Sequence, residues 1–235
     1  MTDPIIAFLN GSSALALVCI SIFLALSFLI KATGRIRYIG FALIGAIAFG
    51  WTGITITFLS VSFTGINQPG VSGIISYFSY SSIPIGALCV VFVTWDVAGA
   101  PKNKKLVIIG YIIFSIVYYT VLYATFNQAV IISDTGIIYD DWITPISLTY
   151  YLLWGIVGLA AVISGIGWIK FRKGGAGEIK KRSNYLLIAS GLVGFCILAD
   201  TVIFISDAFI IVLSIPRIGM ILGVILIYLG FKPAK

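Results

Sequence analysis

Seven long apolar runs constrain this sequence more than any other feature. A helix needs about 20 apolar residues to cross about 30 Å of hydrocarbon. Runs of that length lie at residues 5–30, 38–63, 70–97, 106–126, 144–171, 184–205 and 209–229. Only 10% of the 235 residues are charged, whereas a soluble domain carries about 25%. The sequence therefore predicts an all-α integral membrane protein, with residues 1–235 forming a single domain, a bundle of seven transmembrane helices.

The cations are sorted between the connections that join these runs. They gather in four places, residues 31–37, 102–105, 170–182 and 232–235. The connection at 64–69 is uncharged, and the other connections carry only acids. Because the cytoplasmic loops of membrane proteins are rich in Lys and Arg, we expect an outside N-terminus and an inside C-terminus, in the cell (plasma) membrane. The net charge of +7 follows this sorting, so the expected surroundings are a lipid bilayer and not nucleic acid.

The composition argues against catalysis and metal binding. The chain has no histidine, which removes the commonest general base and the commonest transition-metal ligand. Cys19, Cys89 and Cys196 each lie alone inside an apolar run, without a Cys-x-x-Cys spacing. We interpret these cysteines as small packing residues, and we expect no enzymatic activity, no catalytic residue, no metal and no cofactor.

Arg217 is the one cation of the sequence that falls in none of the four basic segments, and it lies within the last apolar run. At a rise of about 1.5 Å per residue it lies roughly 13 Å below the outer surface, and Asp200 on the sixth run lies roughly 10 Å below it. The shortest connection joins these two runs, which predicts that their helices are neighbours. We therefore expect Asp200 and Arg217 to pair in an intramembrane polar centre. That centre is either a closed ion pair that locks the two helices, or a cavity-lining site that binds an anion or gates a switch.

Prolines and tyrosines mark a second candidate site in the outer half of the bundle. Within a helix, Pro84 frees the carbonyl of Tyr80, and Pro216 frees that of Val212. Underbonded backbone of this kind is tolerated in membranes where protein or water covers it. The candidate pocket comprises Tyr77, Tyr80, Ser82, Pro84, Tyr119, Tyr151 and Pro216. The alternative for its tyrosines is an interfacial aromatic belt.

Asp96 lies at the inner end of the third run. We expect it to form an interfacial ion pair with Arg35, Lys102 or Lys104. The alternative is a proton donor on the inner side.

Two further patterns bear on the architecture. Ser82-Ile83-Pro84 is echoed by Ser214-Ile215-Pro216, and Pro4-Ile5 by Pro145-Ile146, which suggests helices 1–3 and 5–7 as parallel repeats around helix 4. Small residues spaced four apart, Gly219-x-x-x-Gly223 among them, predict close helix packing.

The topology, the cation of the last helix followed by Ile218-Gly219-Met220, and Ser82-Ile83-Pro84 resemble the microbial rhodopsins, in which Thr-Thr-Pro stands in the third helix. That family binds retinal through a lysine Schiff base, and this chain has Arg217 there, which does not form one. Phe78 stands nearest to the family's counter-ion. The resemblance thus implies rhodopsin-like topology without covalent retinal. The pattern from Arg217 to Tyr228-Leu229-Gly230-Phe231-Lys232-Pro233 is also similar to archaeal seven-helix membrane proteins of uncharacterised function.

Two functions fit these observations. The first is a receptor-like or scaffolding sensor, which detects a ligand, lipid or partner from its outer half and acts through a separate signalling partner at the basic inner loops. The second is a small-solute or ion transporter built on the 3+1+3 repeat, with a proline in the last helix of each repeat.

Overall fold

The computed structural model describes residues 4–65, 69–125, 131–132, 138–139, 148–203 and 212–232. For residues 69–79, 125, 131–132, 138–139, 149–150 and 201–203 it describes the backbone alone. These residues form α1 (Pro4–Lys31), η1 (Gly34–Ile36), α2 (Arg37–Ala42), η2 (Leu43–Ala48), α3 (Phe49–Thr64), α4 (Pro69–Ala98), α5 (Lys104–Thr125), β1 (Ile131–Ile132), β2 (Ile138–Tyr139), α6 (Leu148–Gly174), α7 (Gly177–Ile203) and α8 (Ser214–Phe231).

Seven helical spans in the described residues are long and apolar enough to cross a membrane. The second of them is composite, because η1, α2, the π-helical segment η2 and α3 follow one another without a break from Gly34 to Thr64. The strands β1 and β2 form only a two-residue antiparallel pair. The predicted fold, an all-α seven-helix membrane bundle, is confirmed.

The start of the sixth helix differs most from the prediction. We expected the sixth helix to begin at residue 184, but α7 begins at Gly177 and includes most of the predicted basic loop. Polar residues continue a helix beyond the membrane where local charges favour it: Glu178 lies in the first turn of α7 and pairs with Arg182 at 3.3 Å. The predicted start of the last helix, at 209, lies outside the described residues, and α8 as described begins at Ser214. The predicted start of the fifth helix, at 144, lies outside the described residues.

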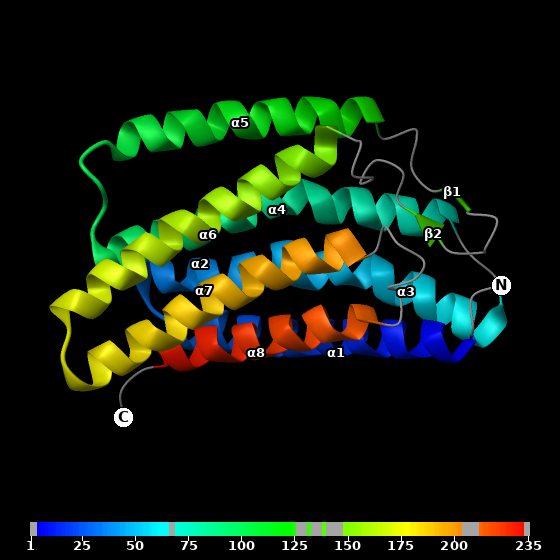
Figure 1. The fold of residues 1–235 in the computed structure, drawn as a ribbon, viewed down its shortest axis with the longest axis horizontal. Coiled ribbons are helices and arrows are strands. Elements are labelled where there is room, and N and C mark those ends of the chain that lie inside the picture. Colours follow the sequence, from blue (N-terminus) through cyan, green and yellow to red (C-terminus); the bar gives the residue numbers. More distant parts are fainter. Residues whose placement is uncertain are drawn as a thin grey trace.

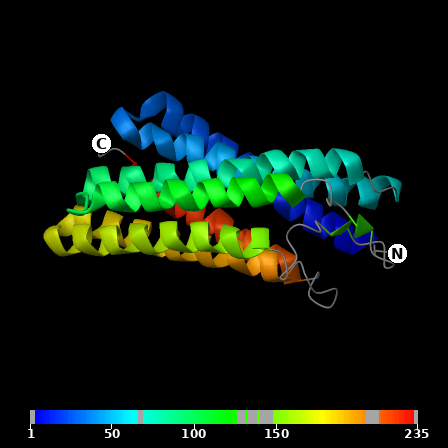
Figure 2. The ribbon, with the colours of Figure 1, turned by 90° about the horizontal axis from the view of Figure 1, so that it is seen from above.

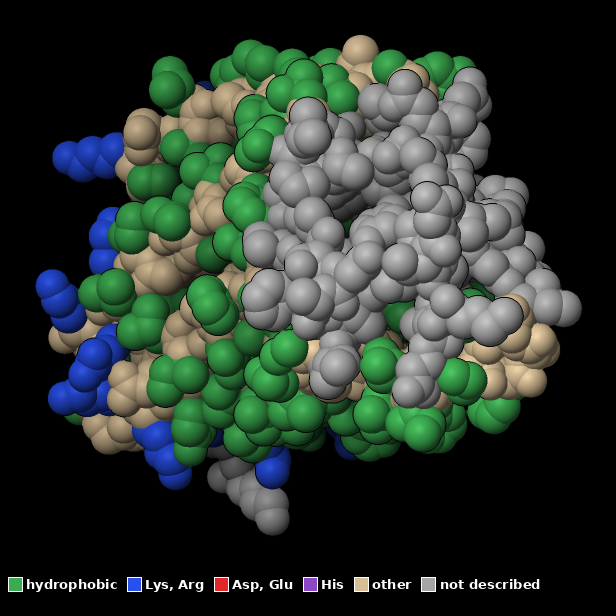
Figure 3. Space-filling model, turned by 45° about the vertical axis from the view of Figure 1, so that its right-hand side comes forward, with side chains coloured by type: hydrophobic (Ala, Val, Ile, Leu, Met, Phe, Trp, Pro, Cys, Tyr) green, Lys and Arg blue, Asp and Glu red, His purple; other side chains and the backbone are tan. Residues whose placement is uncertain are grey.

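Six of the spans form a ring, and the remaining one lies outside it. In order around the ring come α1, the α2–α3 span, α4, α6, α7 and α8, which contacts α1 again. Helix α5 lies on the outside, against α6 and α4 (Figures 1 and 2). Helix α1 begins and α8 ends at opposite ends of the bundle (Figure 1). Hydrophobic side chains cover much of the face drawn in Figure 3, and most of its Lys and Arg side chains lie toward one end.

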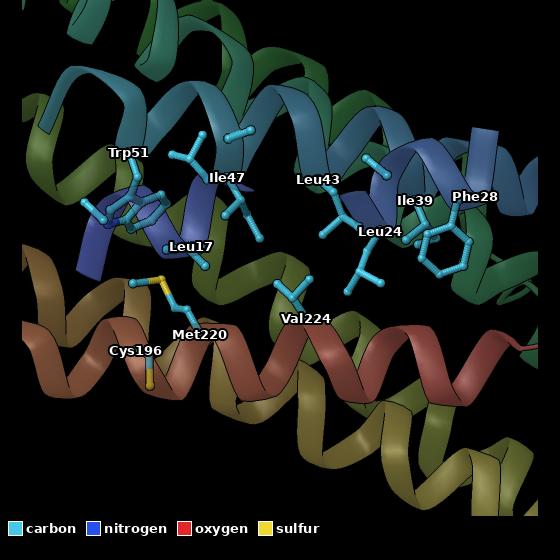
Figure 4. Packing of buried hydrophobic residues seen from close by; sticks show 14 of the residues in the cluster. Leu17, Leu24, Phe28, Ile39, Leu43, Ile47, Trp51, Cys196, Met220 and Val224 are labelled. Carbon is cyan, nitrogen blue, oxygen red and sulfur yellow. The ribbon is translucent and has the colours of Figure 1, made fainter. Parts of the chain in front are cut away.

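The largest apolar cluster joins α1, the α2–α3 span, α7 and α8, together with Val93 of α4. Met220 points from α8 toward Leu17 and Trp51, while Val224 continues the contact along the helix (Figure 4). Glycines bring α8 close to α7, as the small-residue spacing predicted. A Cβ at each would lie 2.5 Å from a side-chain atom of α7: Cys196 for Gly219, Val193 for Gly223 and Leu186 for Gly230.

Helix α4 continues through Pro84, where tyrosine hydroxyls of α5 donate hydrogen bonds to carbonyls of the α4 backbone. The Tyr118 hydroxyl donates to the carbonyl of Tyr80 at 3.1 Å, the carbonyl that Pro84 deprives of its helical donor. The Tyr111 hydroxyl donates to the carbonyl of Pro84 itself at 2.7 Å. In the π segment η2, the carbonyl of Gly45 accepts a hydrogen bond from the Ser82 hydroxyl. These bonds fix α4 between α5 and the second span.

Candidate intramembrane polar centre

The ion pair between Arg217 and Asp200 is the core of the candidate site. Arg217 Nε lies 3.1 Å from Asp200 Oδ1, and the two side chains are 0% and 4% exposed. The glycines of α8 allow α7 and α8 to approach closely enough for this contact. A buried charge is tolerable when it is paired and hydrogen-bonded, and each of these residues provides the other's counter-charge.

Burial explains why the two charges need each other. Asp200 lies near the end of the described part of α7, and Arg217 lies near the start of α8. Neither side chain has the water that would solvate an isolated charge. Each charge is therefore stabilised by the other.

Three further side chains complete the centre from α1 and α3. Arg217 Nη1 donates to the carbonyl of Asn10 at 2.7 Å and lies 3.4 Å from Ser13 Oγ. The indole N–H of Trp51 donates to Asp200 Oδ2 at 3.2 Å. The Arg217 guanidinium carbon lies 5.9 Å from the ring centroid of Phe58, close enough for a cation–π contact. The centre thus ties α1, α3, α7 and α8 together.

The centre is closed and almost fully bonded. Arg217 Nη2 is buried without a hydrogen-bond partner in the described part of the chain, and both carboxylate oxygens of Asp200 accept a bond. Of the two arrangements left open by the sequence, a closed pair and a cavity-lining pair, the geometry corresponds to the closed pair. Sequence reasoning missed Asn10, Ser13, Trp51 and Phe58. The signal available for Ser13 was a polar residue within an apolar run, whereas Asn10 bonds Arg217 through its backbone carbonyl, which no side-chain pattern indicates.

Pro216 and Arg217 lie near the start of α8 as the structure describes it. We predicted Pro216 in the interior of a helix that begins at residue 209; α8 begins at Ser214, so Pro216 falls within its first turn, and residues 209–211 lie outside the described residues. Proline is accommodated there because the first turn has no helical acceptors for its N–H groups. Pro216 is buried and breaks no hydrogen bond in the interior of α8.

The residues of the predicted outer pocket lie in several separate places in the structure. Tyr80 and Tyr119 pack against the apolar cluster of α4, α5 and α6, and the Tyr119 hydroxyl donates to the carbonyl of Ser81 at 2.6 Å. Tyr151 is 56% exposed on α6. The side chain of Tyr77 lies outside the described residues. Ser82 and Pro84 belong to the α4 contacts described above and Pro216 to α8, so these residues support helix packing where the structure describes them.

Asp96 pairs with Arg35 at 2.7 Å, with side chains 38% and 59% exposed. This is one of the interfacial partners that the sequence predicted. Surface pairs of this kind contribute about 0–1 kcal/mol, so the contact joins α4 to η1 without large stabilisation.

A cavity of about 130 Å³ lies inside the bundle, next to the polar centre. Its lining comes from α2, η2, α3, α4, α6, α7 and α8 and is almost entirely apolar. Trp51 connects the two features, since its ring lines the cavity and its N–H binds Asp200. The sequence predicted neither this cavity nor its position.

Comparison with known proteins adds no assignment to this geometry. A scan against models of protein families, a search of curated proteins and a search of solved structures each found no match to this chain.

Proposed function

We propose that this protein is a receptor-like or scaffolding seven-helix membrane protein that detects a small molecule within the bundle and acts through a separate partner. Its N-terminus lies outside and its basic end faces the cytoplasm, in the cell membrane. Covalent retinal plays no part, because Arg217 stands where a Schiff-base lysine would be needed.

The contact of Trp51 with both the cavity and Asp200 carries this proposal. A molecule in the cavity touches the Trp51 ring, and any displacement of that ring alters the bond to Asp200. Hydrogen bonds to charged groups contribute about 1.5–3 kcal/mol, which is enough to shift a two-state equilibrium about tenfold or more. Since the centre holds four spans together, such a shift changes how they pack.

The output surface in this proposal is the basic end of α6 and α7. Helix α7 extends beyond its apolar run to Gly177, and its first turns carry exposed lysines. A partner with an acidic surface fits this end, because opposite charges steer association.

Photo-crosslinking in native membranes tests the proposal. A photoreactive residue replaces Ile179, which is 47% exposed at the basic end, and the control replaces Ile113, which is 57% exposed on the outer helix α5. We expect a protein adduct at residue 179 and only lipid adducts at residue 113. We also expect Trp51→Phe, which deletes the N–H and keeps the ring, to change the yield at residue 179 severalfold.

A transporter is the alternative, and the structure supports it less well. The proline echo that motivated its repeat joins Pro84, in the interior of α4, to Pro216, in the first turn of α8. Uptake of a solute by proteoliposomes, abolished by Asp200→Asn and accompanied by no adduct at residue 179, would replace the receptor proposal with this one.

A further inference from the structure

We propose that the intrabundle cavity is a binding site for a small, largely apolar molecule with a single oxygen, an alcohol, aldehyde or ketone, whose oxygen pairs with Ser164. The assignment rests on the proposed receptor function, of which it names the ligand class. It is carried by the chemistry of the cavity wall and by one buried hydroxyl.

The wall selects an apolar molecule about the size of a six-membered ring. Small residues from α2, η2, α4 and α6 leave the space open: Ala42, Ala46, Gly86, Ala87, Ala160 and Ala161. Trp51 and Trp168 add aromatic faces. An engineered apolar cavity of about 150 Å³ remains dry and binds benzene, and the present cavity of about 130 Å³ is of the same order.

Ser164 supplies the polar contact. It lines the cavity and is 1% exposed, and its Oγ has no hydrogen-bond partner in the part of the chain that the structure describes. An unbonded buried hydroxyl costs about 1–3 kcal/mol, so this position favours a ligand that supplies the missing partner. A hydroxyl both donates and accepts, so it can pair with either a carbonyl or an alcohol oxygen.

The neighbouring serine does not compete for this role. Ser190 also lines the cavity, but its Oγ accepts a hydrogen bond from the indole N–H of Trp168 at 3.1 Å. A single water on Ser164 would occupy about 30 Å³ and leave most of the space empty against apolar walls. A lipid acyl chain would fill the space but would leave the Ser164 hydroxyl unpaired. A ring-sized molecule with one oxygen satisfies both the volume and the hydroxyl.

Binding of cyclohexanol and of methylcyclohexane to the purified full chain tests the assignment. The two probes have similar shape, and only the first has an oxygen. We expect cyclohexanol to raise the unfolding temperature saturably, and methylcyclohexane to bind about fivefold to tenfold more weakly, since it lacks one hydrogen bond. Fluorine NMR of 4-fluorophenol, displaced by cyclohexanol, measures the same site on the unmodified chain, with protein-free micelles as the blank.

Matched variants locate the site. Ser164→Ala should abolish the preference for cyclohexanol, while Ser21→Ala should preserve it, because Ser21 is a buried serine without a described partner that does not line the cavity. Ala161→Phe should abolish binding of both probes, while Ala124→Phe, at an exposed position of α5, should not. If Ser164→Ala does not fold, the displacement experiment and the Ala161 and Ala124 variants still show whether the probes bind in the cavity.

The outcomes separate this assignment from the receptor proposal. Equal affinity for the two probes would show that the cavity takes hydrocarbon such as an acyl chain, and the absence of saturable displacement would show that it takes neither; either result overturns the assignment. Saturable, Ser164-dependent binding that leaves the adduct at residue 179 unchanged would support the site and contradict the receptor function.

Discussion

At the scale of residues, the energetics of this protein concentrate on Arg217 and Asp200. Each charge is buried, so neither is tolerable alone. Trp51 and the carbonyl of Asn10 complete the bonding. Removing one partner of a buried pair typically costs about 3–5 kcal/mol, whereas replacing both is often nearly neutral.

This argument predicts strong coupling between the two side chains. Arg217→Leu should lower the free energy of unfolding by about 3–5 kcal/mol, and Asp200→Asn combined with Arg217→Leu should be less destabilising than Arg217→Leu alone. Denaturant titration measures the free energy of unfolding of the unmodified protein, the two single variants and the double variant, which together form a double-mutant cycle. The exposed pair Arg35 and Asp96 provides the control, because its cycle should show coupling of no more than about 1 kcal/mol. Strict additivity for the buried pair would contradict the account.

At the scale of elements, close approach of helices positions the polar centre. Helices α7 and α8 touch along their glycines, and a Cβ at Gly223 would lie 2.5 Å from Val193 Cγ2. Helix α4 is held differently, through tyrosine hydroxyls that bond its backbone around Pro84. The two devices differ because a glycine removes a steric obstacle, whereas a tyrosine supplies the donor that proline lacks.

The glycine contacts predict opposite effects for the same substitution at two positions. Gly223→Ala should destabilise the bundle by about 1–3 kcal/mol, because the new methyl group overlaps Val193 and the helices must separate. Gly191→Ala on α7 meets nothing within 4 Å, so it should be neutral or stabilising by about 0.5–1 kcal/mol through helix propensity. Thermal unfolding of both variants checks the contrast. A neutral Gly223→Ala would show that α7 and α8 are less closely packed than described.

At the scale of the whole molecule, the bundle divides into a ring of six spans and the outlying helix α5. The apolar cavity and the polar centre are both lined by spans of the ring, while α5 presents many of its isoleucines outward. This division suits a membrane protein, because lipid covers apolar helix faces and buried polar groups gather inside. The end of α3 and the end of α6 lie at opposite ends of the bundle (Figure 1).

The orientation in the membrane is tested by cysteine labelling in intact cells. In a background with Cys19, Cys89 and Cys196 replaced by Ala, a membrane-impermeant maleimide should label Phe63→Cys, at the end of α3. Lys173→Cys, at the end of α6, should react only after lysis, since the side richer in Lys and Arg stays in the cytoplasm. The reverse pattern would invert the topology.

How far the sequence predicts this structure depends on whether a feature is local. Runs of apolar residues predicted the seven spans because the length of a membrane helix depends on the hydrocarbon thickness alone. The start of α7 was missed because its polar turns carry no membrane signal, and the π segment η2 because it interrupts a uniformly apolar run.

The sequence by itself determined the fold class, the number of spans and the candidate partner for Arg217. Burial of a charge and chain connectivity leave few alternatives for these features. Only the tertiary structure decided that Asn10, Ser13 and Trp51 join the pair, that the predicted pocket residues it describes serve mainly in packing, and that a cavity lies beside Trp51. These contacts depend on which faces of distant helices meet. A helix that is apolar on all sides has little hydrophobic periodicity from which its buried face could be predicted.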